Sequence, residues 1–187
     1  MKTVLDLGAY NGESSRGYVS KGDRWILVDN CQYTQYDGWR RPQLADEELD
    51  YLEYYEMDIM KWKEPADLVI CSNVIYHVED PWALIKHLRK LTLNTMILKT
   101  QTDPIGSGDW CWHNVENPLS GHEGTNETIF YRPTEQALLN ELRSVGFTCG
   151  EVQHVDGIFS IFICGVGRKR LSLDVPEGKG VECKVWE

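Results

Sequence analysis

Four short apolar runs recur in the N-terminal part of the chain, and each carries almost no alternating polar residue. Their sequences are TVLDLG (residues 3–8), WILVD (25–29), DLVICS (67–72) and TMILKT (95–100). A strand with one solvated face alternates apolar and polar residues, whereas a strand buried on both faces is a continuous apolar run. The four runs therefore predict buried strands of a parallel sheet.

Two segments show helical periodicity together with helix-boundary residues. The first begins at Asp80, a favourable N-cap, and Pro81 follows at the first helical position. The second begins at Thr134, which can cap the helix, and Gly146 stands where a C-terminal glycine belongs. The apolar stripes are Leu84, Ile85, Leu88 and Leu91 in the first segment and Leu138, Leu139, Leu142 and Val145 in the second.

Strand-like runs at residues 148–155 and 158–167 are separated by Asp156-Gly157, a strong hairpin signal. Alternating strands and helices followed by an antiparallel hairpin predict an open α/β sheet, mostly parallel, with helices on both faces.

A length of 187 residues suits one domain, which we place at residues 1–170. Residues 104–128 interrupt the alternation and are rich in Gly, Asn, Ser, Asp and Trp, so we expect a long insert there. Long loops of compact domains often act as lids or binding loops, and this one is predicted to be a mobile lid over the substrate. Residues 171–187 are expected to form a tail with a short hairpin around residues 176–178.

Charge, hydropathy and cysteine usage exclude several classes of protein. The net charge of −10 argues against a broad nucleic-acid interface, which would have to neutralise phosphates. No apolar run reaches the roughly 18 residues of a membrane span, and the N-terminus enters a strand directly rather than a signal peptide. The six cysteines are scattered with no CxxC pair, so we expect reduced thiols in a cytoplasmic protein.

The end of the first predicted strand carries Asp6, Gly8 and Gly12. Glycines at a strand-to-helix turn allow tight turning and close approach of the backbone to a ligand. Asp29 ends the next strand and can accept hydrogen bonds from both hydroxyls of a ribose. The alternatives are an ordinary turn at the glycines and a turn-capping role for Asp29. Farther on, Asp58 lies between apolar residues and could accept from an adenine amino group.

Five segments in order resemble the class I S-adenosylmethionine-dependent methyltransferases: LDLGAYNG, ILVDN, MDI, DLVICSNVIYHVEDPWALIKHLRKL and RPTEQALLNELRSVGF. The resemblance covers residues 2 to about 167 and implies a Rossmann-like fold with S-adenosylmethionine as cofactor. Within the family, NVIYHVEDP and FYRPTEQALLNELRSVGF are most similar to the enzymes that modify the tRNA wobble uridine. Tyr10 departs from the common pattern, since many members have a glycine there.

The resemblance also implies roles for individual residues. Gly8 and Gly12 would border the methionine and ribose, and Asp6 would reach the amino group through backbone or water. Tyr10 would lean over the methionine portion, and Asn73 would lie beside it. The predicted cofactor-binding residues are Asp6, Gly8, Tyr10, Gly12, Asp29, Asn30, Asp58, Ile59 and Asn73, with Asp58 and Ile59 bracketing the adenine.

The sulfonium methyl would then lie near Tyr76 and His77, the predicted catalytic residues. A base is needed only where the nucleophile carries a proton, and His77 is the preferred base or orienting group. Its alternative role is to cap or hydrogen-bond the following helix. The predicted substrate contacts are Trp110, Trp112, His113, Tyr131 and Arg132.

The two tryptophans could stack on a planar substrate, or they could instead anchor the loop by being buried. Cys111, His113 and His122 match no compact zinc pattern, so no metal is predicted.

These observations predict a methyltransferase that uses S-adenosylmethionine and acts on a small molecule, with neither nucleic acid nor membrane as its main partner. Two alternatives remain open. One is a tRNA-modifying methyl or carboxymethyl transferase, and the other is a domain that binds S-adenosylmethionine without catalysis.

Overall fold

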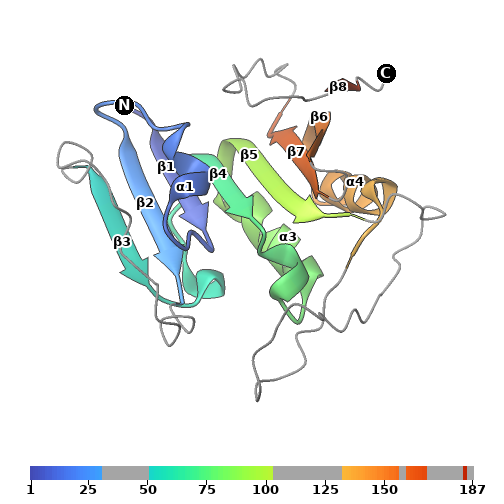
Figure 1. Cartoon of the computed structure of the whole chain (residues 1–187), viewed down its shortest axis with the longest axis horizontal. Coiled ribbons are helices and arrows are strands. Elements are labelled where there is room, and N and C mark those ends of the chain that lie inside the picture. The colour runs from blue at the N-terminus through green and yellow to red at the C-terminus, as the bar shows by residue number, and fades with distance from the viewer. Residues whose placement is uncertain (31–50, 103–131, 156–158, 168–182, 185–187) are drawn as a thin grey trace.

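A computed structural model describes residues 1–30, 51–102, 132–155, 159–167 and 183–184 of the chain. They form one eight-stranded sheet with the order β3-β2-β1-β4-β5-β7-β6-β8 (Figure 1). The strands are β1 (Thr3–Leu7), β2 (Arg24–Asp29), β3 (Leu52–Glu56), β4 (Ala66–Ser72), β5 (Thr92–Gln101), β6 (Thr148–Val155), β7 (Phe159–Gly165) and β8 (Cys183–Lys184).

Strands β1 to β5 pair in parallel, whereas β7 pairs antiparallel with both β5 and β6. The mostly parallel α/β sheet with a C-terminal antiparallel pair is therefore confirmed. The hairpin residues 156–158 and the predicted turn at 176–178 lie outside the described residues. The tail contributes β8, which pairs with β6 at the edge of the sheet.

Helices cover both faces, as predicted. Helix α3 (Pro81–Leu91) and helix α4 (Glu135–Ser144) pack on one face, together with the 3-10 turns η2 (Ile59–Lys61) and η3 (Ile75–His77). The opposite face carries the short helix α1 (Glu13–Arg16), which contacts β1 and β4, and a second apolar cluster centred on Trp25 and Leu27.

The predicted caps hold both long helices in place. The Asp80 carboxylate accepts from the Ala83 amide at 2.9 Å, and the Thr134 hydroxyl accepts from the Ala137 amide at 3.1 Å. Gly146 follows α4 with a φ of +94°, a left-handed conformation that favours glycine.

The expectation of reduced thiols is corrected at one pair, because Cys149 on β6 and Cys164 on β7 form a disulfide. The two cysteines are directly opposed in the antiparallel register, with Cα atoms 4.0 Å apart. Strand pairing, rather than spacing along the chain, brings them together. Cys71 on β4 is a buried free thiol, and burial raises its pKa.

The packing of α3 generates a stability prediction. Leu84 is fully buried against the sheet, so Leu84→Ala is expected to lower the free energy of unfolding by about 2–5 kcal/mol. Leu93→Ala is the matched control, because the Leu93 side chain on β5 is 53% exposed. That change should stay within about 0.5 kcal/mol. Urea denaturation measures both changes. A loss for Leu84→Ala as small as that expected for Leu93→Ala would contradict the packing of α3 in the core.

Candidate functional site

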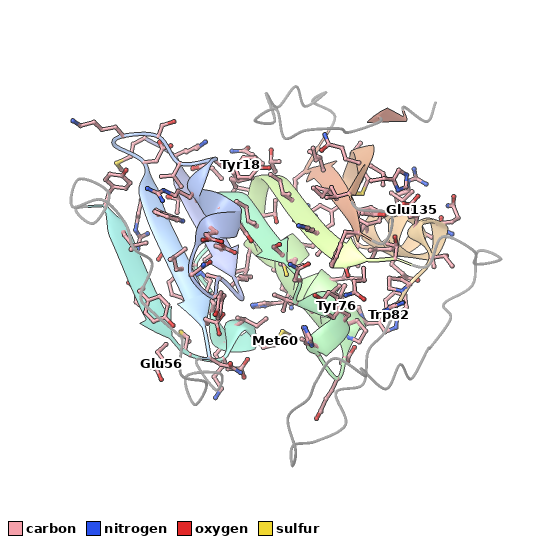
Figure 2. All side chains as sticks on the ribbon, in the orientation of Figure 1. Tyr18, Glu56, Met60, Tyr76, Trp82 and Glu135 are labelled. Atoms are coloured by element: carbon pink, nitrogen blue, oxygen red, sulfur yellow. A yellow bond between two sulfur atoms is a disulfide. The ribbon has the colours of Figure 1, made fainter. Side chains whose placement is uncertain are left out.

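The carboxyl ends of β1, β2, β3 and β4 meet at one edge of the sheet. In the strand order, β1 lies between β2 and β4, and this reversal is the switch point where open α/β sheets bind ligands. Figure 2 shows Met60, just after β3, and Tyr76, just after β4, along this edge. The topology therefore brings together the sequence segments predicted to bind the cofactor.

The turn after β1 packs closely against its neighbours. The amides of Gly8 and Ala9 both donate to the Val28 carbonyl, at 2.8 and 3.3 Å. Gly8 and Gly12 each have a φ of +75°. A Cβ at Gly8 would overlap the Cγ2 of Val74, and one at Gly12 would lie 2.9 Å from the Cδ1 of Leu27. Glycine is therefore required at both positions by backbone conformation and by space.

Among the described residues, two other than glycine are also left-handed, and both lie at this edge. Tyr10 has a φ of +50° and Asn73 a φ of +61°. Such conformations cost of order 1–3 kcal/mol and persist only where surrounding contacts impose them. The Asn73 amide donates to the Lys99 carbonyl at 2.8 Å, and the Tyr10 amide donates to Asp29 Oδ2 at 2.8 Å. The two left-handed residues thus lie at two adjacent strand ends, β1 and β4.

Asp29 connects three of the predicted segments. Its carboxylate accepts from Tyr10 in the turn after β1, and its carbonyl accepts from the Met57 amide after β3 at 2.8 Å. Asp29 is half-buried and Asn30 is exposed. The residue thus shapes the turn as well as presenting a carboxylate at the edge, so the alternative turn-stabilising role and the binding role are compatible.

Asp58 begins the turn η2. Its Oδ1 accepts from the Met60 amide at 2.9 Å, and its carbonyl accepts from the Lys61 amide at 2.9 Å. This capping role was not anticipated from the sequence. Its carboxylate keeps acceptor sites for a further donor, and Ile59 follows on the same turn.

Asp6 is an unusual carboxyl group. It is fully buried at the end of β1, and neither of its oxygens has a hydrogen-bond partner of normal geometry among the described residues. Burial is the main cause that raises the pKa of Asp6 to about 7, with a smaller contribution from the nearby charge of Asp29, while the Ser15 hydroxyl acts in the opposite direction.

Asn73 Oδ1 is the other buried side-chain atom in the described part of the chain that has no hydrogen-bond partner. Buried polar atoms are nearly always paired in folded proteins, so an orphaned one needs an explanation. Here all of them belong to the two strand ends that flank the switch point. A ligand that offers donors and positive charge at this edge would satisfy them.

Tyr76 and His77 lie on η3, directly after β4. The His77 amide donates to the Val74 carbonyl at 2.8 Å, and the rings of Tyr76 and His77 have centroids 4.2 Å apart, tilted by 50°. Tyr76 is buried, whereas His77 is exposed. Surrounding protein atoms partly desolvate the imidazole and lower its pKa, so it is neutral at pH 7. The Asp80 carboxylate accepts from the Ala83 amide and caps α3. The alternative role of His77, a hydrogen bond to the following helix, stays a prediction.

Of the five predicted substrate residues, the structure describes Arg132. Trp110, Trp112, His113 and Tyr131 lie outside the described residues, as does the predicted lid of residues 104–128. Arg132 is described, and its Nε donates to Gln101 Oε1 at the end of β5, 3.0 Å away.

The metal prediction is untested for its named residues. Cys111, His113 and His122 also lie outside the described ranges. Within those ranges, no group of three His, Cys, Asp or Glu side chains could hold a metal ion. In the same part of the chain, no helix has the length and apolar character needed to cross a membrane.

A second polar cluster at the ends of β5, β6 and β7 was not anticipated from the sequence. Thr102 Oγ1 lies 2.8 Å from Ser160 Oγ, which donates to Glu135 Oε1 at 2.5 Å, and His154 Nδ1 lies 2.9 Å from the same oxygen. The four residues come from four separate segments, so no local motif could have revealed them. They place polar and ionisable groups beside Arg132 at the β5 end of the same sheet edge.

Comparison with known proteins identifies relatives at the level of family and fold. Residues 1–152 match the family model described as a methyltransferase domain. No functionally curated protein matches the sequence at a significant level.

Similar solved structures include magnesium protoporphyrin IX methyltransferase from Synechocystis PCC 6803 with bound S-adenosylmethionine. It is 20% identical with a TM-score of 0.60, over 88% of this chain and 69% of that one. Another is 1,6-didemethyltoxoflavin-N1-methyltransferase from Burkholderia thailandensis, with bound substrate and S-adenosylhomocysteine. It is 15% identical with a TM-score of 0.64, over 88% of this chain and 71% of that one.

The buried Asp6 carboxyl generates a pH-dependent stability prediction. Burial raises the pKa of Asp6 from the usual value of about 4 to about 7. Between these two pH values, the carboxyl is protonated in the folded state and ionised in the unfolded chain. Stability is therefore lost as pH rises from about 4 to 7, by at most about 4 kcal/mol. Asp6→Asn should be more stable than the wild type at pH 8, with the difference vanishing towards pH 4.

Urea denaturation across this pH range measures the effect. Glu56→Gln, at an exposed position of β3, is the control and should follow the wild type. A constant difference between Asp6→Asn and the wild type at every pH would contradict the proposed titration of Asp6.

Proposed function

The chain belongs to the methyltransferase domain family, and from this premise we propose that it transfers a methyl group from S-adenosylmethionine to a small-molecule acceptor. The observation that carries the proposal is the sheet edge at the switch point, where a glycine turn, two strained residues and orphaned buried polar atoms coincide. Similar folds bind S-adenosylmethionine or S-adenosylhomocysteine.

The residues at this edge fit the cofactor chemically. The orphaned carboxyl of Asp6 and the amide oxygen of Asn73 suit the ammonium group of the methionine portion, directly or through water. Asp29 has carboxylate oxygens for the ribose hydroxyls, and Asp58 with Ile59 suits the edge and face of adenine. A positive ligand would also favour the ionised form of Asp6, offsetting the cost of its burial.

When bound, S-adenosylmethionine supplies an activated methyl group whose bond to sulfur breaks as the acceptor attacks, leaving S-adenosylhomocysteine. The protein must hold the acceptor in line with that bond and exclude competing water. The neutral imidazole of His77 can accept the proton that a hydroxyl or amine acceptor loses, and the Tyr76 ring beside it restrains its orientation.

The acceptor would bind at the β4 and β5 ends, between η3 and the polar cluster of Thr102, Glu135, His154 and Ser160. The two named relatives act on magnesium protoporphyrin IX and on 1,6-didemethyltoxoflavin, both small molecules. The net charge of −10 favours such an acceptor over the tRNA alternative, because RNA binding depends on neutralising phosphates.

Calorimetric titration with S-adenosylhomocysteine tests the cofactor site. We expect micromolar affinity for the wild type, and Asp29→Ala should weaken binding by about 1–3 kcal/mol. The loss combines the missing ribose acceptor with the missing partner of the Tyr10 amide. Glu56→Ala is a matched control, since Glu56 is the exposed register partner of Asp29 on β3. Absence of binding by the wild type would overturn the proposed function.

Turnover tests the role of His77. Acceptors would first be identified by mass spectrometry of methylated products, and His77→Gln should then lower kcat by about 10²–10⁴-fold for a protonated nucleophile. Affinity for S-adenosylhomocysteine should stay within about twofold, because the imidazole acts on the acceptor. In the wild type, kcat should rise with pH with a midpoint below that of a free imidazole, since desolvation lowers the pKa of His77. An unchanged kcat in the variant would remove His77 from catalysis.

A further inference from the structure

His87 makes a contact that the proposed mechanism does not use. It lies in the middle of α3 and is half-buried, and its Nε2 is 3.0 Å from the carbonyl oxygen of Ile59. A carbonyl oxygen can only accept a hydrogen bond, so Nε2 must carry the proton and donate. The contact joins α3 to η2, two elements that are 28 residues apart at these positions.

The turn η2 has few internal constraints. It is a 3-10 turn of three residues, and a turn this short is oriented mainly by what surrounds it. Its internal bonds are those from the Met60 and Lys61 amides to Asp58 and from the Trp62 amide to the Ile59 carbonyl, which is longer at 3.3 Å. These bonds maintain the turn's shape, and the Met57 amide bond to the Asp29 carbonyl and the buried Trp62 side chain hold its two ends. Between these ends, the Ile59 carbonyl is held by the bond to His87.

Helix α3 supplies the fixed reference. Leu84, Ile85, Leu88 and Leu91 are all buried in the main core, so the helix is anchored on both sides of His87. The imidazole therefore ties the Ile59 carbonyl of the short turn to a helix that is anchored in the core. Because Ile59 directly follows Asp58, the bond acts on the residues that would contact adenine.

We propose that His87 is a positioning residue that holds the Asp58–Ile59 turn against the adenine ring and thereby sets the selectivity of the cofactor site for the base. The inference rests on the proposed function. Adenine carries an amino donor at its position 6, which a carboxylate can accept. Hypoxanthine carries a carbonyl oxygen there. If Asp58 is well placed, its carboxylate and this oxygen are both acceptors and cannot pair, so the affinity for the hypoxanthine form is lower. Selectivity is then a measure of how firmly the turn is held.

The test compares affinities for S-adenosylhomocysteine and S-inosylhomocysteine, which differ only in the base. In the wild type, calorimetry should show clear preference for the adenine form. His87→Leu keeps a helix-forming side chain but removes the donor, and we expect the preference to fall about tenfold. His87→Gln restores a donor of similar reach and should recover most of the preference, which a purely space-filling role would not predict.

Arg89→Leu is the matched control. Arg89 also lies on α3 and its Nε also donates to a backbone carbonyl, that of Gly146, at 3.3 Å. Arg89→Leu removes the contact of α3 with the residue Gly146 after α4 and leaves the contact with η2 in place. The base preference should therefore remain that of the wild type. His87→Asn is a further variant in case His87→Leu does not fold, because its shorter amide cannot span the distance and should also lose the preference.

Each outcome is decisive. An unchanged base preference in folded His87→Leu, or an equal loss in Arg89→Leu, overturns the role of His87 while leaving the proposed function intact. Failure of the wild type to bind S-adenosylhomocysteine overturns both. A reduced preference that is confined to His87→Leu and His87→Asn and recovered in His87→Gln supports the inference.

Discussion

The parallel pairing of β1 with β2 on one side and β4 on the other is the constraint on which the rest of the structure depends. With both neighbours in place, the central strand is buried on both faces and along both edges. Its carboxyl end lies at the switch point of the strand order, where open α/β sheets bind ligands. The turn after β1 is bonded to Asp29 at the end of β2, and the strained Asn73 follows β4, the neighbour on the other side.

The same pairing explains why a destabilising set of residues is tolerated. A buried carboxyl without partners and two left-handed residues would each weaken a marginal fold. Here they lie on a sheet whose two faces carry extensive apolar clusters. A bound ligand could offset the unfavourable free energy of these residues. Such local destabilisation is typical of binding sites.

The sheet edge carries polar residues in two separate regions. At one end, Asp29, η2 and His87 form the region suited to a nucleoside, tied to the core by α3. At the other, Gln101, Arg132 and the cluster around Glu135 form a polar region suited to the acceptor. Tyr76 and His77 lie between them on η3. Under the proposed function, the cofactor and the acceptor would therefore contact different strands.

The sequence alone predicts four strands of the parallel sheet (β1, β2, β4 and β5), both capped helices, the glycine turn and the acids at the strand ends. These follow from periodicity and from contacts within a few residues, such as Asp80 with Ala83. Four features follow from the tertiary structure alone: the Cys149–Cys164 disulfide, the His87 contact with Ile59, the cluster around Glu135 and the raised pKa of Asp6. Each of these depends on strand order, on register or on desolvation by distant segments. Such properties arise only when the whole chain packs, so no local pattern can encode them.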